Sequence, residues 1–118
     1  MNAVGQFNLE HEAAVLAAVK FDNSVFDRVN LKPSDFYSSE YGELFKIIGQ
    51  IIESGRSADN LVIYDEIKKS GAKVSASTIA RLEAVSSANV SYYADSVLEL
   101  SRKRRISGLI PLVQDSLK

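Results

Sequence analysis

Apolar side chains recur at helical spacing along most of this chain, whereas strict alternation of apolar and polar residues persists nowhere. The clearest run extends from Tyr41 to Ile52, with apolar residues at i, i+3, i+4, i+7, i+10 and i+11. Ser38 or Ser39 can cap its start, and Gly55 can end it in the left-handed conformation. With no Asn-Gly or Asp-Gly hairpin turn, the pattern predicts an all-α fold, a compact bundle of about five to six helices.

The first helix is predicted to begin after Asn8, a good N-cap residue, and to end near Asp22. Residues 13–19 within it are apolar on every side, which is typical of a helix at the centre of a bundle. A short helix is expected at about residues 24–29. Pro33 then prevents further helix and favours a turn.

Polar caps and a glycine mark the helices of the second half. Asp59 is expected to cap a helix that ends at Gly71. Ser75 or Ser77 is expected to cap the next helix. The last helix is expected to start after Asn89 and to run almost to the C-terminus. The residues expected to face inward from the first two of these are Leu61, Tyr64, Ile67, Ile79, Leu82 and Val85.

The last helix carries two apolar stripes that point in different directions. The first consists of Val90, Tyr93, Ala94 and Val97, and the second of Ile106, Leu109, Ile110, Val113 and Leu117. Val97 and Ile106 are nine residues apart, which is half a turn out of phase at ~3.6 residues per turn. A continuous helix would therefore turn the second stripe away from the bundle, toward another partner. Two alternatives remain open: Pro111 breaks the helix and folds the stripe back, or the tail frays.

The predicted core is drawn from these stripes and from two aromatic residues, Phe36 and Tyr37, that follow the turn at Pro33. The residues expected to fill it are Leu16, Phe26, Phe36, Leu44, Phe45, Ile48, Ile52, Ile67, Leu82, Tyr93 and Val97.

The composition fits one soluble domain. The chain has 118 residues, no cysteine and a formal net charge of −1. The absence of cysteine excludes disulfides and thiolate metal sites, and near-neutrality argues against autonomous binding to DNA phosphates. No apolar run reaches the ~20 residues that span a bilayer, and the N-terminus lacks the basic start of a secretory signal. We expect a cytoplasmic protein that contacts no membrane.

The sequence predicts no catalytic, cofactor-binding or metal site. None of its glycines belongs to a phosphate-binding loop, so this chain is not expected to hydrolyse nucleotides. The single histidine, His11, is interpreted as a surface residue of a first helical turn, not as a base or metal ligand. The carboxylates, among them Glu40, Glu43, Asp65 and Glu66, are expected on solvated helix faces.

Two clusters could contact nucleic acid. The basic run from Arg102 to Arg105 could contact phosphate or an acidic partner, but consecutive helical residues point around the whole circumference, which favours a solvated segment. Tyr92 and Tyr93 could stack on bases, but their place at the start of an amphipathic helix favours packing of at least one in the core.

Several stretches, in order along the chain, resemble one family. Asn8 to Leu16 is a short glutamate-containing segment that leads into a hydrophobic run. Leu31 to Tyr37 contains a leucine, a proline and then Asp-Phe-Tyr, and the helix from Tyr41 is followed by Gly55 and Asp59. The last stretch is Ala88-Asn89-Val90-Ser91-Tyr92-Tyr93-Ala94, with Val97 and Arg104-Arg105-Ile106 beyond it. Together they resemble the N-terminal domain of DnaB-family replicative DNA helicases over residues 8 to about 110.

The resemblance implies a tail at residues 1–7, a globular head at 8–100 and the start of a helical hairpin arm at 101–118. In this family such hairpins pair between subunits, and six domains form a collar that docks the C-terminal domain of primase. Loader proteins also act on the ring in some systems. The resemblance therefore implies a non-catalytic collar domain that contacts DNA only through its parent assembly. ATP and Mg²⁺ would belong to the parent helicase, beyond a chain expected to be a fragment.

This chain departs from the family pattern at three places. Ala17 replaces a usual glycine, residues 71–77 lack a double glycine, and Pro111 interrupts the arm. The alternatives are the helicase-binding C-terminal domain of a DnaG-type primase, a small helical enzyme and a helical DNA-binding module. A start near Met1 and the Asn89-Val90 motif favour the helicase over the primase.

Overall fold

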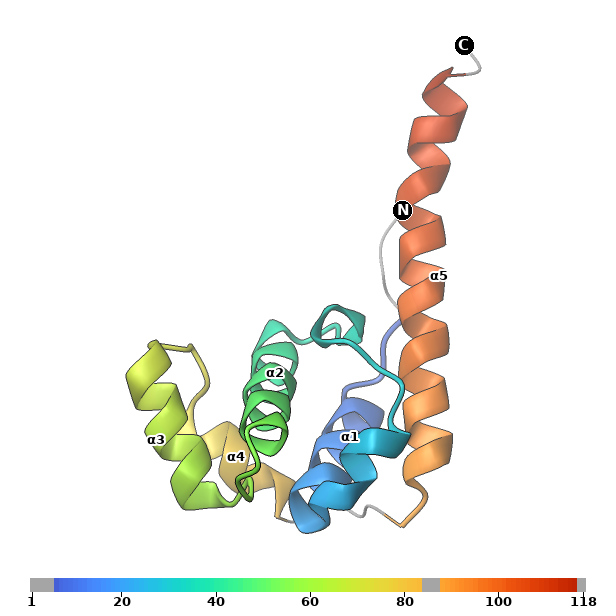
Figure 1. The fold of residues 1–118 in the computed structure, drawn as a ribbon. Helices are drawn as coiled ribbons and strands as arrows, with labels where there is room; N and C mark the ends of the chain where they lie inside the picture. The colour runs from blue at the N-terminus through green and yellow to red at the C-terminus, as the bar shows by residue number, and fades with distance from the viewer. Residues whose placement is uncertain (1–5, 84–87, 117–118) are drawn as a thin grey trace.

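The computed structural model describes residues 6–83 and 88–116, with side chains as far as Gly108. In this part of the chain every regular element is helical (Figure 1), which confirms the all-α prediction. The elements are α1 (Leu9–Phe21), the 3-10 helices η1 (Asn23–Arg28) and η2 (Pro33–Asp35), α2 (Ser39–Glu53), α3 (Asn60–Ser70), α4 (Ala76–Leu82) and α5 (Val90–Ser116).

Four helices begin where a side chain accepts a hydrogen bond from the first turn. Asn8 accepts from the His11 N–H at 3.0 Å, and Ser38 from the Tyr41 N–H at 3.1 Å. Asp59 and Ser75 cap α3 and α4 in the same way. Each cap satisfies an amide that has no partner within its own helix, which explains why the helices start at these residues.

The α1 helix lies at the centre of the head, between α2 and α5 (Figure 1). Every residue from Glu12 to Val19 is buried, because neighbouring elements cover all sides of the helix. The small side chains of Ala13, Ala14, Ala17 and Ala18 allow these neighbours to approach closely.

Most of the expected core residues are buried. Leu16, Leu44 and Ile48 are completely inaccessible. Phe45 lies between Phe26 and Phe36, with ring centroids 5.3 and 5.0 Å away. Phe36, Phe45, Leu82 and Val97 are also buried, whereas Phe26, Ile52, Ile67 and Tyr93 are half-buried and pack against the core from its edge.

Two expectations about inward-facing residues are wrong. Leu61 is 71% exposed, because α3 packs against the head through the side that carries Ile63, which is fully buried. Tyr37 is 47% exposed because it lies over the rim of the core, where only Phe36 enters. Val85 lies outside the described residues.

The α5 helix is much longer than the head that it contacts. Its first turns pack against α1, and the rest of the helix projects beyond the bundle (Figure 1). The helix is continuous to Ser116 and therefore passes through Pro111 without a break. No helix in the described part of the chain combines the length and apolar character needed to cross a membrane.

Candidate assembly site

The side of α5 that faces the head changes from apolar to polar where the helix leaves the bundle. Ala94 and Val97 are buried against the head. Helical spacing then brings Ser101, Arg104 and Ser107 to the same side of the helix. This side is therefore held to the head first by apolar packing and then by hydrogen bonds.

Arg104 connects α5 to two segments that are distant in sequence. One guanidinium nitrogen, Nη1, donates to the Gln6 carbonyl and the other, Nη2, donates to the Asp35 carbonyl, each at 2.7 Å. The guanidinium carbon also lies 5.6 Å from the centroid of the Tyr37 ring, within the range of a cation–π interaction. Phe7 stacks in turn on the Tyr37 ring, and the two ring centroids are 4.0 Å apart.

Asp35 is a buried carboxylate beneath this arginine. One oxygen, Oδ1, accepts a hydrogen bond from the Ser101 hydroxyl at 2.7 Å and lies 3.5 Å from Nη2 of Arg105. The other, Oδ2, accepts from the Lys32 N–H at 2.8 Å. These partners compensate for the loss of water around the buried charge.

Ser107 makes the outermost of these contacts, because its hydroxyl accepts a hydrogen bond from the Gln6 amide at 2.8 Å. We call the set Gln6, Asp35, Ser101, Arg104 and Ser107 the arm clasp. It spans two helical turns, from the last turn against the head to the first turn beyond it.

Glu12 is a second buried carboxylate, next to the arm clasp. Its two oxygens accept from the Tyr37 N–H at 2.8 Å and the Ser38 N–H at 3.2 Å, at the entrance to α2. Burial raises the pKa of this carboxyl, and the two N–H donors and the Arg104 charge offset part of that rise. Glu12 therefore fixes the loop before α2 onto α1.

His11 is half-buried at the α1–α5 contact, so it is not the solvated first-turn residue that the sequence suggested. Its Nδ1 is 2.7 Å from the Ser96 hydroxyl, and its ring packs beside those of Tyr92 and Tyr93. Tyr93 is half-buried and belongs to the core edge, whereas Tyr92 is 65% exposed. The two tyrosine rings meet at 73°, edge to face, so they do not form a flat stacking platform.

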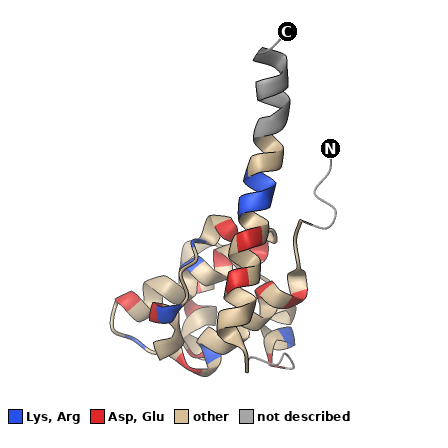
Figure 2. Ribbon diagram, turned by 90° about the vertical axis from the view of Figure 1, so that its right-hand side faces the viewer, with Lys and Arg blue, Asp and Glu red and all other residues tan. Residues whose placement is uncertain are grey.

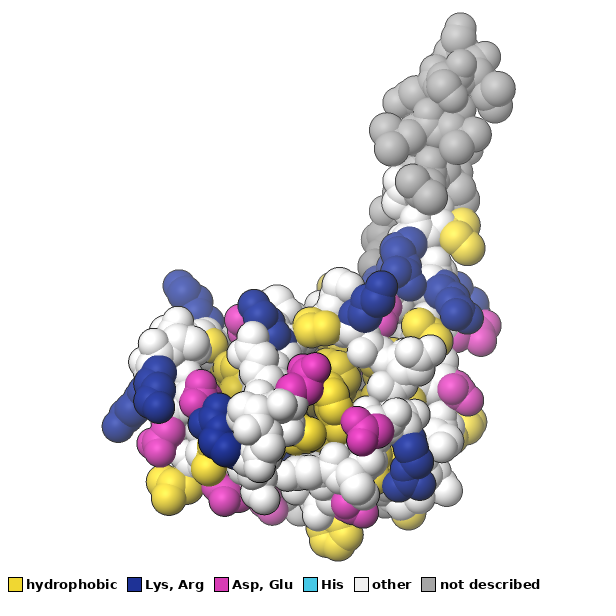
Figure 3. Space-filling model, in the orientation of Figure 1, with side chains coloured by type: hydrophobic (Ala, Val, Ile, Leu, Met, Phe, Trp, Pro, Cys, Tyr) yellow, Lys and Arg dark blue, Asp and Glu magenta, His cyan; other side chains and the backbone are white. Residues whose placement is uncertain are grey.

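The basic run at the base of the arm is divided between two roles. Arg102, Lys103 and Arg105 are exposed, and Figures 2 and 3 show a basic turn of α5 at the base of the arm. Arg104 is half-buried in the arm clasp, so the expectation of a wholly solvated run is wrong at this residue.

The second apolar stripe begins on the opposite side of the helix from the arm clasp. Ile106 is 60% exposed, as expected for a residue half a turn away from Val97. The side chains of Leu109, Ile110 and Val113, and the whole of Leu117, lie outside the described residues. The interface assigned to this stripe stays a prediction.

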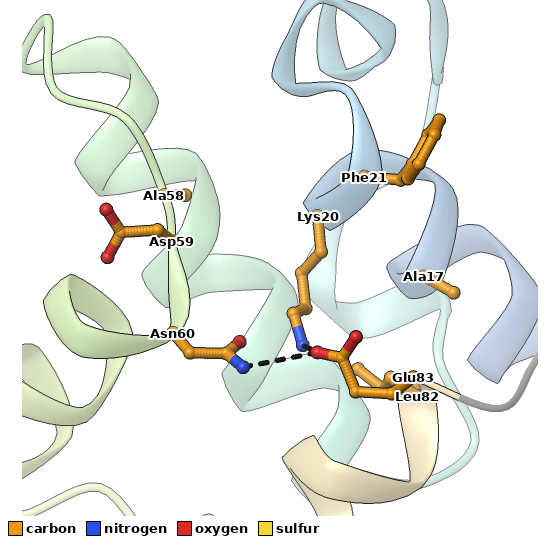
Figure 4. Close-up of a pocket in the computed structure, with 8 residues that line it drawn as sticks. All are labelled: Ala17, Lys20, Phe21, Ala58, Asp59, Asn60, Leu82 and Glu83. Atoms are coloured by element: carbon orange, nitrogen blue, oxygen red, sulfur yellow. Dashed lines mark hydrogen bonds and ion pairs between the residues drawn. The ribbon is translucent and has the colours of Figure 1, made fainter.

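A separate hollow of about 380 Å³ lies between α1, α3 and α4 (Figure 4). The Lys20 ammonium and the Asn60 amide both donate to one oxygen of Glu83, at 3.0 and 3.2 Å. The hydrogen bond from Lys20 lowers the pKa of the Glu83 carboxyl most, and that from Asn60 lowers it further. The carboxylate is thus already paired with a cation and an amide, as in a structural ion pair that links three elements.

None of these surfaces has the composition of a catalytic centre. Within the described residues, no three histidine or carboxylate side chains gather closely enough to hold a metal ion. Glu40, one of the carboxylates expected on a solvated face, accepts the Ser75 N–H at 2.7 Å and so joins α2 to α4. The polar side chains of the head therefore mainly connect elements.

The sequence pattern did not identify Asp35 and Arg104 as residues that attach α5, or Glu12 as the residue that holds the loop before α2. One signal was available for Glu12, because a glutamate directly before an all-apolar helical run must itself be covered when that helix is central. No local signal distinguishes Arg104 from the exposed basic residues beside it, since its partners are 69 and 98 positions away in sequence.

Comparison with protein families gives one match over most of the chain. A model described as "DnaB-like helicase N terminal domain" matches residues 5–99. Among curated proteins, the chain is 32% identical over 106 residues to the replicative DNA helicase DnaB of Treponema pallidum. It is 29% identical over 112 residues to the replicative DNA helicase DnaB of Rhodothermus marinus. The alignments cover 84% and 89% of this chain but only 24% and 12% of those helicases.

Comparison with solved structures shows the same fold. The N-terminal domain of DnaB helicase from Helicobacter pylori superposes with a TM-score of 0.83 at 24% identity, over 92% of this chain and 89% of that one. The corresponding domain from Mycobacterium tuberculosis gives 0.84 at 23% identity, over 92% and 83%. Each of these domains therefore has the same overall fold as this chain.

Proposed function

Because the chain belongs to the family of DnaB-like helicase N-terminal domains, we propose that it is the non-catalytic collar domain of a replicative DNA helicase. In this role it joins helicase subunits to one another and docks primase at the replication fork. The observation that carries the proposal is the family match over residues 5–99. The two curated relatives reported above are replicative helicases, which favours this function over that of a primase domain.

The α5 helix supports a role in self-association. It extends beyond the head as far as Ser116, and its Ile106 is exposed at the start of the second apolar stripe. Full burial of a large aliphatic side chain stabilises a contact by roughly 1.5–3 kcal/mol, so five such residues can drive pairing of two arms. Self-pairing of one surface is isologous and gives a two-fold dimer.

Primase docking rests on a relative. The work on the Helicobacter pylori domain concerns its interactions with primase, and we propose the same class of partner for this chain. A helicase loader is a further candidate partner. ATP and Mg²⁺ would be bound by another part of the parent helicase, which works in the cytoplasm and contacts DNA through the assembled ring.

Sedimentation velocity of the 118-residue chain tests self-association. We expect a concentration-dependent monomer–dimer equilibrium that Ile106→Asp weakens strongly, because the contact would bury a charge. Leu61→Asp is the matched control, since Leu61 is a similarly exposed aliphatic residue on α3. A wild type that remains monomeric at high concentration, or equal loss of dimer in both variants, contradicts the role of the arm.

Primase docking is tested by isothermal titration of the chain with the C-terminal domain of the primase encoded in the same genome. A saturable binding isotherm is expected. Absence of binding to this domain and to full-length primase, by a chain that is folded by circular dichroism, would refute this half of the proposal.

A further inference from the structure

The direction of the arm depends on very few contacts. Val97 is the last residue of α5 that is buried in the apolar core, and the helix continues to Ser116. Beyond Val97, the helix is held to the rest of the chain by the hydrogen bonds of the arm clasp and by the ion pair between Arg105 and Asp35. We propose that Arg104 is a positioning residue that fixes the angle between arm and head.

The chemistry of arginine suits this task. The planar guanidinium bears several N–H donors in a rigid fork, so it can hold two carbonyl oxygens at a set separation. Arg104 uses this fork to bridge the Gln6 and Asp35 carbonyls. Both acceptors are backbone atoms, so their positions follow the path of the chain and not a side-chain rotamer. A lysine is a single point charge and can fix neither the spacing nor the plane.

The Asp35 carboxylate strengthens the same restraint. Asp35 accepts the Ser101 hydroxyl one turn before Arg104, so the helix is held at two points and cannot rotate freely about its axis. Asp35 is only 3% exposed, and an unpaired carboxylate at this depth would be destabilising. The loop of η2 therefore strongly favours the helix in this position.

A small change in the angle at the base of the arm becomes a large displacement at its far end. At ~1.5 Å per residue, Gln114 lies about 25 Å along the helix from Val97. A change of about 10° at Val97 would therefore move that part of the arm by about 4 Å. Side chains that interdigitate between two helices tolerate less than this, because their fit depends on single methyl groups.

The biological role of this angle rests on the proposed pairing of arms. The angle between arm and head can nevertheless be measured on an isolated chain. The chain contains no cysteine, so Lys46→Cys and Gln114→Cys introduce two unique sites for spin labels, in the head and in the arm. Pulsed electron resonance on labelled protein, diluted with an excess of unlabelled chain, gives the distribution of distances within one molecule.

We expect one narrow distance for the parent protein. Arg104→Met should broaden the distribution about twofold or shift it by about 4 Å, and Arg104→Lys should have an intermediate effect. Arg102→Met is the control, because Arg102 is an exposed arginine of the same helix and should leave the distances unchanged. If Arg104→Met does not fold, Ser101→Ala and Arg104→Lys replace it as tests, with a smaller broadening expected.

An unchanged distribution in folded Arg104→Met, or in both replacement variants, overturns the proposal. Equal broadening in Arg102→Met also overturns it, because the effect would then follow from loss of any basic residue. Sedimentation separates this inference from the proposed function. If the wild type is monomeric but the angle changes in Arg104→Met, only the pairing of arms is contradicted. If the wild type dimerises but the angle does not change in Arg104→Met, only the role of Arg104 is contradicted.

Discussion

At the scale of single residues, the buried polar side chains distinguish this head from a simple apolar bundle. Glu12, Asp35 and Ser101 are almost inaccessible, and each makes a hydrogen bond to a segment distant in sequence. Such groups are tolerated in a core only when they are paired, so each of them restricts how the surrounding segments can lie. The apolar residues stabilise the head, and these polar residues connect its segments.

Phe45 is expected to be the most sensitive apolar position. It is 2% exposed and contacts the rings of Phe26 and Phe36. Phe45→Ala should lower the free energy of unfolding by about 3–5 kcal/mol, because it removes buried surface and leaves a cavity. Urea denaturation measures this change, and Leu61→Ala on the exposed side of α3 should change stability by less than about 0.5 kcal/mol. A loss below ~1 kcal/mol for Phe45→Ala would contradict its central position.

Glu12→Gln should destabilise the head by about 1–3 kcal/mol, because an amide can accept from only one of the two N–H donors at the start of α2. The effect should depend on pH. The pKa of Glu12 is raised by burial, so the folded chain binds a proton more readily than the unfolded chain. The stability that Glu12 contributes is therefore fully present below the ordinary carboxyl pKa of about 4.3 and is lost as pH rises through the raised value.

The glutamine variant lacks this titration, so the stability difference between wild type and Glu12→Gln should shrink as pH rises through that window. Glu40 provides a control of opposite sign. The Ser75 N–H lowers the pKa of its carboxyl, so the stability that Glu40 contributes is present above the ordinary pKa and lost as pH falls. Urea melts of Glu12→Gln and Glu40→Gln across pH measure both, and slopes of the same sign would refute the assignment.

At the scale of elements, α5 combines two functions that the other helices keep apart. Its first turns complete the head, and its later turns leave the head with the arm clasp at the boundary. The helix crosses Pro111 without ending. A proline inside a helix removes one N–H donor and strains the preceding turn, so this part of the arm has weaker local support.

Pro111→Ala is therefore expected to strengthen the arm. The new N–H can donate to the Ser107 carbonyl, and alanine is favoured over proline in a helix interior by about 3 kcal/mol. Amide hydrogen exchange after residue 107 should become slower, whereas exchange in α1 and α2 should not change. Pro33→Ala, at the start of η2, should leave exchange in the arm unaltered. Equal or faster exchange in the arm of Pro111→Ala would show that the proline does not limit it.

At the scale of the whole molecule, basic and acidic residues are interspersed over the head in the views of Figures 2 and 3. The densest basic region is the turn at the base of the arm, where Arg104 is already engaged in the clasp. With a net charge of −1, the chain should attract DNA phosphates only weakly. The arrangement suits a domain whose main partners are proteins.

DNA binding by the isolated chain should therefore be weaker than about 1 µM at physiological salt. Fluorescence anisotropy with a labelled single strand and a labelled duplex measures this. Binding in the nanomolar range with a steep dependence on salt would contradict the expectation and would direct attention to Arg102, Lys103 and Arg105.

The chain alone should not hydrolyse ATP, because its sequence contains no phosphate-binding loop. Phosphate release by purified protein should equal the background without enzyme. Turnover above background that a point mutation in the chain abolishes would overturn this prediction, since a contaminating ATPase would not respond to the mutation.

Local sequence determined the helices of this protein because their signals act over a few residues. The caps at Asn8, Asp59 and Ser75 and the left-handed Gly71 lie where hydrogen-bonding preference and backbone freedom place them. The all-apolar run in α1 likewise indicated a central helix before any packing was known. Apolar periodicity also placed most of the core, because a stripe at helical spacing must be covered by another element.

Tertiary structure alone decided which residue of the basic run the head would engage. Arg102 and Arg104 are two residues apart in the same basic run, yet only Arg104 meets carbonyl groups, brought to it from residues 6 and 35 by the packing of α1 and η2. Leu61 and Ile63 differ in burial for the same reason, since the side of α3 that is covered depends on where α2 lies. Contacts between distant segments depend on the whole packing arrangement, and no local preference encodes it.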